Sequence, residues 1–231
     1  MPSTEIRPAS AIGRKREGGL GGGPGARRRP ALRRPEPWEF ELLRLTAEQH
    51  GIPFDQLARF IGCDIDQAAR VAKHLFESGF ADYGRFLHAE PHWLWLTPRG
   101  ARLSGTEFAG GCPRVGAMDR IRAVNEVRLH IAKRAPEARW ICGRSVLREQ
   151  GKKGRRPNAV VEIGRERHAI LVKHGDRQAE WRERDIVESL MRGYDAVVAF
   201  CAPYPGNLYR RLASEHHWPK LVVRDIPERP A

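Results

Sequence analysis

The sequence has few cysteines and no long apolar run, and both absences narrow the class of protein. Only 4 of the 231 residues are cysteine, and none belongs to a CxxC pair. This scattered usage predicts neither a disulfide framework nor a zinc site, and it is typical of a reducing cytoplasm. Because no run of about 18 apolar residues occurs, no transmembrane helix is expected. The N-terminal residues offer charge, glycine and proline rather than an apolar stretch, so no secretory signal is expected either.

Positive charge, by contrast, is abundant and unevenly distributed. The chain carries 41 Lys and Arg against 28 Asp and Glu, a formal net charge of +13. Residues 1–37 contribute +6 and residues 106–231 contribute +9, whereas residues 38–105 carry −2. An excess of this size predicts a polyanionic partner, most often nucleic acid. We therefore expect double-stranded DNA as the partner, with most of the phosphate affinity supplied by the two ends of the chain.

Residues 1–37 are predicted to form a disordered basic tail. They combine a glycine run at 18–25 with the cluster Arg27-Arg28-Arg29 and few apolar side chains, so little burial would offset the cost of ordering. The glycines do not form a phosphate loop, because no strand precedes them and no Lys-Ser or Lys-Thr pair follows. Such a tail is either simply solvated or adds non-specific phosphate contacts.

Residues 38–103 have the pattern of a winged helix-turn-helix domain. Helices are predicted at 38–49 and 55–61, and a third begins after Asp64, which with Gln67 forms a capping box. The apolar residues of this third helix recur at helical spacing as far as Phe76, which indicates one buried face. Strand candidates at 80–83 and 92–97 would supply the hairpin of the wing.

The outward face of the third helix is the predicted DNA-recognition surface. In a DNA-binding winged helix, the second helix of the pair enters the major groove. Gln67 and Arg70 carry the donor and acceptor groups that read adenine or guanine edges. Phosphate contacts are expected from three further residues: Lys73, His74 and, on the wing, Arg85. The alternatives are an ordinary solvated face or a protein-docking module, since the −2 charge of this segment opposes phosphate binding.

A second domain, residues 118–226, is predicted after a linker at 104–117 that is rich in glycine and small residues. The order of its segments predicts an α/β (α+β) domain with a mixed sheet. The expected segments are a helix at 118–134, a strand at 139–142, a hairpin over 158–173, a helix at 180–192, a strand at 196–200, a helix at 207–216 and a strand at 220–223. A short helix is also expected near Val146 and Leu147.

The span from Trp38 to Val223 resembles the replication-relaxation proteins of bacterial plasmids and mobile elements. The resemblance rests on these segments: Leu96-Thr97-Pro98-Arg99-Gly100, Val124–Leu129, Trp140, Arg155–Val161, Ala169-Ile170 and Tyr194–Val197. It implies a DNA-associated role in replication, transfer or transcription on mobile DNA, in the cytoplasm with the nucleoid or a plasmid. It also implies that the C-terminal domain is similar to the PD-(D/E)xK nuclease core.

The residues that match that nuclease site are degenerate. The core needs carboxylates on two strands, because Mg²⁺ prefers hard oxygen ligands. Here the Pro-Asp position reads Pro157-Asn158 and the Glu-x-Lys position reads Leu171-Val172-Lys173. Lys173 is kept, Glu126 matches the accessory acid, and Glu162 on the face of Asn158 is a candidate displaced ligand. We therefore expect a domain that keeps the fold without the chemistry, with no metal, no cofactor and no enzymatic activity.

A basic loop beside this face, residues 151–156, is the second predicted DNA contact. Its cationic residues are Lys152, Lys153, Arg155 and Arg156, and the alternative is a solvated connection. The sequence as a whole predicts a DNA-binding regulator or accessory factor in which the winged helix selects the site and the basic C-terminal domain adds affinity. Two other classes stay open: a metal-dependent nuclease with a displaced ligand set, and an adaptor that docks another protein. Assembly as a homodimer is also left open.

Overall fold

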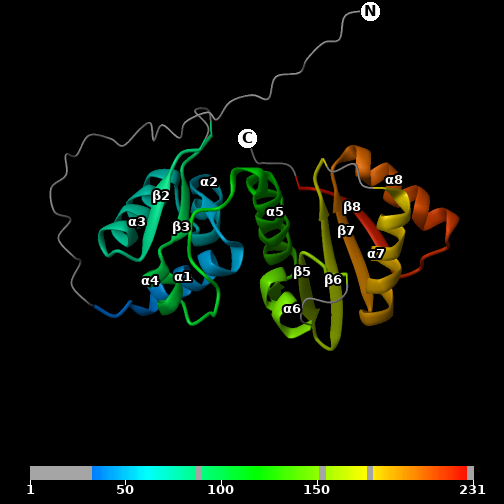
Figure 1. Ribbon diagram of the computed structural model, residues 1–231, viewed down its shortest axis with the longest axis horizontal. Coiled ribbons are helices and arrows are strands. Elements are labelled where there is room, and N and C mark those ends of the chain that lie inside the picture. Colours follow the sequence, from blue (N-terminus) through cyan, green and yellow to red (C-terminus); the bar gives the residue numbers. More distant parts are fainter. Residues whose placement is uncertain (1–32, 87–89, 151–154, 176–178, 228–231) are drawn as a thin grey trace, which may run out of the picture. The chain divides into compact units, whose positions relative to one another are not determined.

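The computed structural model describes residues 33–86, 90–150, 155–175 and 179–227. These residues contain both helices and strands, and the strands form two sheets (Figure 1). The larger sheet is mixed, so the predicted α/β class is confirmed. The described residues belong to one compact unit. In this part of the chain, no helix is both long and apolar enough to cross a lipid bilayer.

The N-terminal half combines four helices with a small antiparallel sheet. The helices are α1 (Pro37–Gln49), α2 (Phe54–Ile61), α3 (Ile65–Glu77) and α4 (Pro98–Leu103). The strands are β1 (Ile52–Pro53), β2 (Ala81–Gly84) and β3 (Trp93–Leu96), in the order β1-β3-β2. The predicted helices and the two predicted strands lie within a few residues of their expected bounds, whereas β1 and α4 were not expected.

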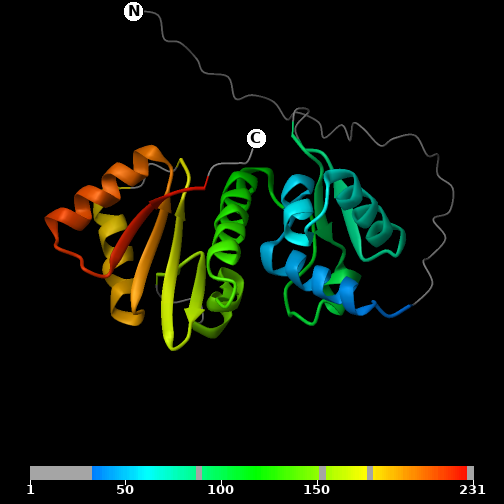
Figure 2. The same ribbon diagram turned by 180° about the vertical axis from the view of Figure 1, so that it is seen from behind.

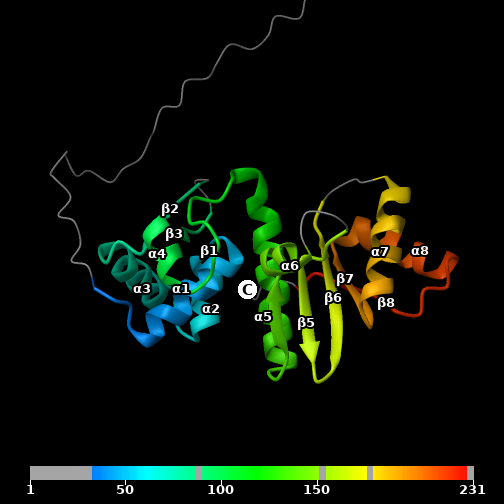
Figure 3. The same ribbon diagram turned by 60° about the horizontal axis from the view of Figure 1, so that its bottom comes forward.

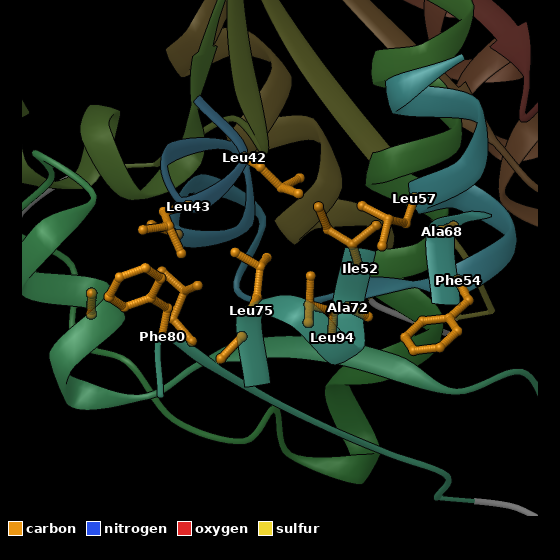
Figure 4. Packing of buried hydrophobic residues seen from close by; sticks show 14 of the residues in the cluster. Leu42, Leu43, Ile52, Phe54, Leu57, Ala68, Ala72, Leu75, Phe80 and Leu94 are labelled. Carbon is orange, nitrogen blue, oxygen red and sulfur yellow. The ribbon is translucent and has the colours of Figure 1, made fainter. Parts of the chain in front are cut away.

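One hydrophobic core joins the first three helices to the small sheet (Figure 4). Leu43, Leu57 and Leu75 come from α1, α2 and α3 in turn, and each is fully buried. Complete burial of such a side chain stabilises the fold by about 2 kcal/mol. Of the α3 side chains, only Ala68, Ala72 and Leu75 are buried. The opposite face of α3 is therefore available for contacts outside this core.

Close backbone packing explains the segment Leu96–Gly100. The Thr97 side chain caps α4, because its Oγ1 accepts a hydrogen bond from the Gly100 amide at 3.1 Å. The same hydroxyl contacts the Gly79 carbonyl oxygen at 2.9 Å. A Cβ at Gly100 would lie only 1.8 Å from the carbonyl oxygen of Phe80. Only glycine fits at position 100, so the packing of the fold explains why the segment Leu96–Gly100 ends in glycine.

The C-terminal half is built on a five-stranded sheet in the order β4-β5-β6-β7-β8. Its strands are β4 (Arg139–Cys142), β5 (Ala159–Ile163), β6 (Glu166–Lys173), β7 (Ala196–Cys201) and β8 (Leu221–Asp225). The first three strands are antiparallel, and β6, β7 and β8 are parallel. Its helices are η1 (Val115–Ala117), α5 (Met118–Arg134), α6 (Gly143–Gln150), α7 (Glu180–Gly193) and α8 (Pro203–Glu215).

Helices cover both faces of this sheet (Figures 1 and 2). On one face, Val127 of α5 packs with Val161 and Ile170. On the other face, Val187 of α7 and Tyr209 of α8 share a core with the strands and with α6. The sheet is thus buried on both sides, which explains the nearly continuous apolar sequences of β6 and β7.

A buried polar network joins α2 to α5, which run close to one another in Figure 3. Gln56 Nε2 donates to Glu126 Oε1 at 2.7 Å and to the Arg122 carbonyl oxygen at 2.9 Å. Asn125 Nδ2 donates to Gln56 Oε1 at 3.0 Å. Arg59 Nη1 completes the network with an ion pair to Glu126 Oε2 at 2.7 Å. Gln56 and Asn125 are fully buried, so these bonds lie inside the molecule.

The β5–β6 turn and the start of α8 each have a local cause. The β5–β6 turn consists of Gly164 and Arg165 alone, because Ile163 pairs directly with Glu166 and Gly164 adopts a positive φ of 60°. Helix α8 begins at Pro203 rather than at 207. Proline is well suited to the first turn of a helix, because its missing N–H would have no partner there.

Candidate nucleic-acid interface

Helix α3 presents the predicted recognition residues on its exposed face. The carboxylate of Asp64 caps the helix, because its Oδ1 accepts a hydrogen bond from the backbone N–H of Gln67 at 2.7 Å. This bond fixes the first turn. Gln67, Arg70, Lys73 and His74 are all exposed, whereas the opposite stripe lies in the core. The structure therefore brings the four predicted residues together along one outward surface.

Gln67 and Arg70 also contact each other. Arg70 Nε donates to Gln67 Oε1 at 2.9 Å, so the pair is held one turn apart on the first half of α3. The bond leaves the terminal guanidinium nitrogens of Arg70 and the amide nitrogen of Gln67 as donors. Lys73 lies one turn further on, 3.8 Å from Glu77. A contact of that length on an exposed surface holds Lys73 only weakly.

His74 differs from the other three because it contacts a buried carboxylate. Its Nε2 lies 2.8 Å from Glu39 Oε1 and 3.1 Å from Arg33 Nη2. Glu39 is fully buried, and Arg33 Nη1 also donates to it at 2.7 Å. His74 thus links α3 to α1, and its contact with phosphate stays a prediction. Arg33 and the cap residue Glu36 fall within the predicted tail, so ordered contacts begin before Trp38.

Arg85 follows directly after β2, where the predicted wing begins, and its side chain is exposed. It lies near the ring of His92, since burial and then the Arg85 charge lower the pKa of that histidine. Residues 87–89 between β2 and β3 lie outside the described residues. Arg85 therefore lies at the end of β2 in the sequence, and its contact with phosphate stays a prediction.

The basic loop is only partly described. Lys152 and Lys153 lie outside the described residues. Arg155 Nη2 forms an ion pair with Asp185 of α7 at 2.6 Å. Arg156 instead lines a pocket together with residues of α5 and α6. The two neighbouring arginines thus belong to different parts of the surface.

The two positions that correspond to metal ligands are occupied by groups with structural partners. Asn158 Oδ1 accepts from the Val172 amide at 2.7 Å, which ties β5 to β6. Leu171 is buried with a 2% exposed fraction in the core beneath α7 and α8. The apolar side chain is therefore part of the packing of the sheet.

Lys173 has a partner that sequence reasoning missed. Its Nζ lies 3.0 Å and 2.9 Å from the two carboxylate oxygens of Glu183. The hydroxyl of Tyr209 donates to the same carboxylate. Burial and then the negative charge of Glu183 raise the pKa of Tyr209 well above its ordinary value. The signal in the sequence is the spacing of Glu183, Val187 and Leu190, which places the carboxylate on the buried stripe of α7.

The other two acidic candidates lie elsewhere. Glu126 faces α2, where Gln56 and Arg59 bind it. Glu162 forms ion pairs with Arg139 at 3.0 Å and Arg167 at 3.2 Å. Within the described residues, neither carboxylate contacts Asn158 or Lys173.

These groups do not fit a Mg²⁺ site of the nuclease type. Mg²⁺ is usually bound through one or two carboxylates, but Leu171 offers no donor and the Asn158 oxygen already accepts a backbone hydrogen bond. The Glu183 carboxylate is shared between Lys173 and Tyr209. No group of three His, Cys, Asp or Glu residues within the described ranges has metal-binding geometry.

Comparison of the chain with protein-family models, with curated proteins and with solved structures gave no match. The resemblance to replication-relaxation proteins therefore stays a prediction drawn from the sequence. Function has to be argued from the site itself.

Proposed function

We propose that the protein is a DNA-binding regulator or accessory factor that selects its site on double-stranded DNA through α3. The observation that carries the proposal is the exposed Gln67–Arg70 pair on the capped first half of a helix whose other face is buried. Arginine pairs well with guanine edges and glutamine with adenine edges in the major groove. In a helix-turn-helix protein, the N-terminal residues of the recognition helix contact the base edges in the major groove.

The order of the surrounding elements supports a winged-helix assignment. A short strand follows α1, two helices come next, and a two-stranded hairpin pairs with the short strand. In this arrangement α3 is the recognition helix, and Arg85 is at the base of the wing. The proposal extends to replication, transfer or transcription of mobile DNA, with the protein in the cytoplasm beside the nucleoid or a plasmid.

Most of the affinity for phosphate would come from the rest of the chain. Residues 38–105 carry a charge of −2, whereas residues 106–231 carry +9. Phosphate contacts position a protein on DNA without reading its sequence, and they make binding strongly dependent on salt. The division predicts that site preference belongs to α3 and that salt-dependent affinity belongs to the C-terminal half and the tail.

Recovery of genomic DNA by the purified full chain tests the proposal. Sheared DNA is mixed with the protein at moderate salt, and the bound fragments are sequenced. We expect a limited set of enriched sites that share a motif and disappear with Arg70→Ala. Uniform recovery of all fragments would leave only a non-specific binder. No recovery at all would favour the adaptor, in which the acidic N-terminal half docks another protein.

A metal-dependent nuclease is the second candidate, and Glu183 is the observation that favours it. It places a carboxylate beside Lys173 in place of the missing strand ligand. The donor set described above does not fit Mg²⁺, so we expect supercoiled plasmid to stay intact with Mg²⁺ or Mn²⁺. Nicking that is abolished by both Lys173→Met and Glu183→Gln, but not by Arg184→Ala, would replace the regulator with the nuclease.

A further inference from the structure

A cavity of about 470 Å³ lies among the end of α1, the start of α5, α6 and residues 156–158. Four arginines line it: Arg114, Arg120, Arg144 and Arg156. They come from four separate segments of the chain, so the folded structure alone brings them together. The volume falls in the range of pockets that hold a single small molecule, about 300–1,000 Å³.

The charges of this arginine pocket are poorly balanced. Arg114 and Arg120 form no ion pair within the described residues. Arg144 Nη1 donates instead to the Ala47 carbonyl oxygen at 2.6 Å. Among the described residues of the lining, the one acidic residue is Glu48. Its carboxylate is already paired with Arg128 at 2.8 Å and with Arg44 at 3.2 Å.

This excess of positive charge affects the pKa of a histidine in the lining. His50 follows α1 and lines the pocket. Burial, and then the charges of Arg144 and Arg120, lower the pKa of its imidazole. At neutral pH the ring is therefore uncharged, and the positive potential of the pocket comes from the arginines.

Two buried N–H donors in the lining have no hydrogen-bond partner among the described residues. Gln49 is 94% buried, with a 6% exposed fraction, and its Nε2 makes no hydrogen bond. Arg156 Nε is likewise buried without a partner. Leaving a buried donor unsatisfied is costly, about 1–3 kcal/mol each. Both atoms are N–H donors, so a ligand that satisfied them would supply acceptor oxygens.

We propose that the arginine pocket binds a small phosphate-bearing anion, such as pyrophosphate or a phosphate monoester. A phosphate group carries several acceptor oxygens and up to two negative charges, which suits a pocket lined by four arginines. A small molecule is favoured over a DNA strand because the four arginines line a cavity of about 470 Å³, which is the size of a small-molecule pocket. The proposal does not depend on DNA binding by α3.

Calorimetric titration of the full chain with pyrophosphate and with inorganic phosphate tests the proposal. The variants are Arg120→Gln and Arg114→Gln, both exposed positions whose replacement leaves the core intact. The matched control is Arg134→Gln, an exposed arginine at the far end of the same helix α5 and outside the pocket lining. We expect saturable binding, at least ~10-fold weaker in each pocket variant because a charge-assisted contact is lost, and unchanged in the control.

NMR titration of His50 separates a seated ligand from general attraction. An anion between Arg120 and Arg144 cancels the charges that depress the imidazole, so its pKa should rise when pyrophosphate is bound. If Arg114→Gln and Arg134→Gln weaken pyrophosphate binding equally, the binding reflects only the positive surface charge, and the proposal is overturned. It would also be overturned if duplex DNA shifts the His50 signals while neither small anion does, because the pocket would then belong to a DNA path.

Discussion

Lys173 and Glu183 form a buried ion pair, with Nζ 2.9 Å from Oε2, at the end of β6. The position that resembles a nuclease lysine is thus occupied by a structural contact between the sheet and α7. Tyr209 donates to the same carboxylate from α8. Three elements of the C-terminal half therefore meet on one carboxylate, and its removal should be felt by all of them.

Glu183→Gln should destabilise the chain by about 3 kcal/mol, because it leaves the Lys173 ammonium in a buried place without its counter-charge. Urea unfolding followed by circular dichroism measures the loss. The control is Glu188→Gln on the same helix, whose contact with Arg184 is exposed and 3.9 Å long, so it should change stability little. Similar losses of unfolding free energy in both variants would show that the Lys173–Glu183 ion pair contributes no more than an exposed contact.

Stability should also depend on acid through Glu39. Burial alone would raise the pKa of this carboxyl, but hydrogen bonds from Arg33, the Glu36 amide and His74 outweigh it and lower the pKa to about 2, from 4.5. A depressed pKa stabilises the folded state above 4.5, and this stability is lost as the pH falls from about 4.5 towards 2.

Replacing the carboxyl tests this dependence. Glu39→Gln should flatten the stability–pH curve below pH 4.5, whereas Glu41→Gln, an exposed residue of the same helix, should keep it. Unfolding midpoints across pH 2–7 decide between them. A curve for Glu39→Gln that runs parallel to the parent would mean that other carboxyls control the acid transition.

Arg70→Ala should cost about 1–3 kcal/mol at the preferred DNA site and relax its specificity. Folding should hardly change, because the side chain is exposed and alanine favours helix. Fluorescence anisotropy on the preferred and scrambled duplexes measures both effects. Arg184→Ala, another exposed helical arginine, is the control. Lys152→Ala with Lys153→Ala should instead weaken binding to both duplexes alike. If Arg70→Ala binds both duplexes like the parent, α3 does not recognise DNA.

Gly100→Ala should be among the most damaging small changes in the chain. The added Cβ would meet the Phe80 carbonyl oxygen at 1.8 Å, and a backbone atom paired in the structure cannot move aside easily. We expect a loss of about 3 kcal/mol or more. Gly193→Ala, where an added Cβ meets nothing within 4 Å, should be tolerated. Thermal unfolding compares the two, and equal melting temperatures would show that the contact between Phe80 and Gly100 can relax.

Elements with strong periodicity were predicted well, and short ones were missed. The helix expected at 118–134 has those bounds in the structure, because its apolar residues recur at helical spacing and Val127 packs on the sheet. Strand β1 has only two residues, and α4 has six, so neither offers a full period. These elements exist because β3 and the Phe80 backbone hold them, which is tertiary information.

The candidate site was predictable only in part, for the same reason. The outward face of α3 follows from helical spacing, so Gln67 and Arg70 were placed correctly on the exposed side. The partner of Lys173 could not be inferred, since Glu183 is ten residues away and reaches it only after α7 folds back on the sheet. The divergence of Arg155 and Arg156 likewise depends on where α7, α5 and α6 pack.

The polar network between α2 and α5 couples the N-terminal half of the described residues to the C-terminal half. Gln56, Asn125 and Glu126 are buried, and Gln56 bonds to both of the others across the two helices. Opening either half alone would break these hydrogen bonds, each worth about 0.5–1.5 kcal/mol, and would expose the helix contact to water. The chain should therefore unfold in a single transition, with the amide hydrogens of α2 and α5 equally slow to exchange.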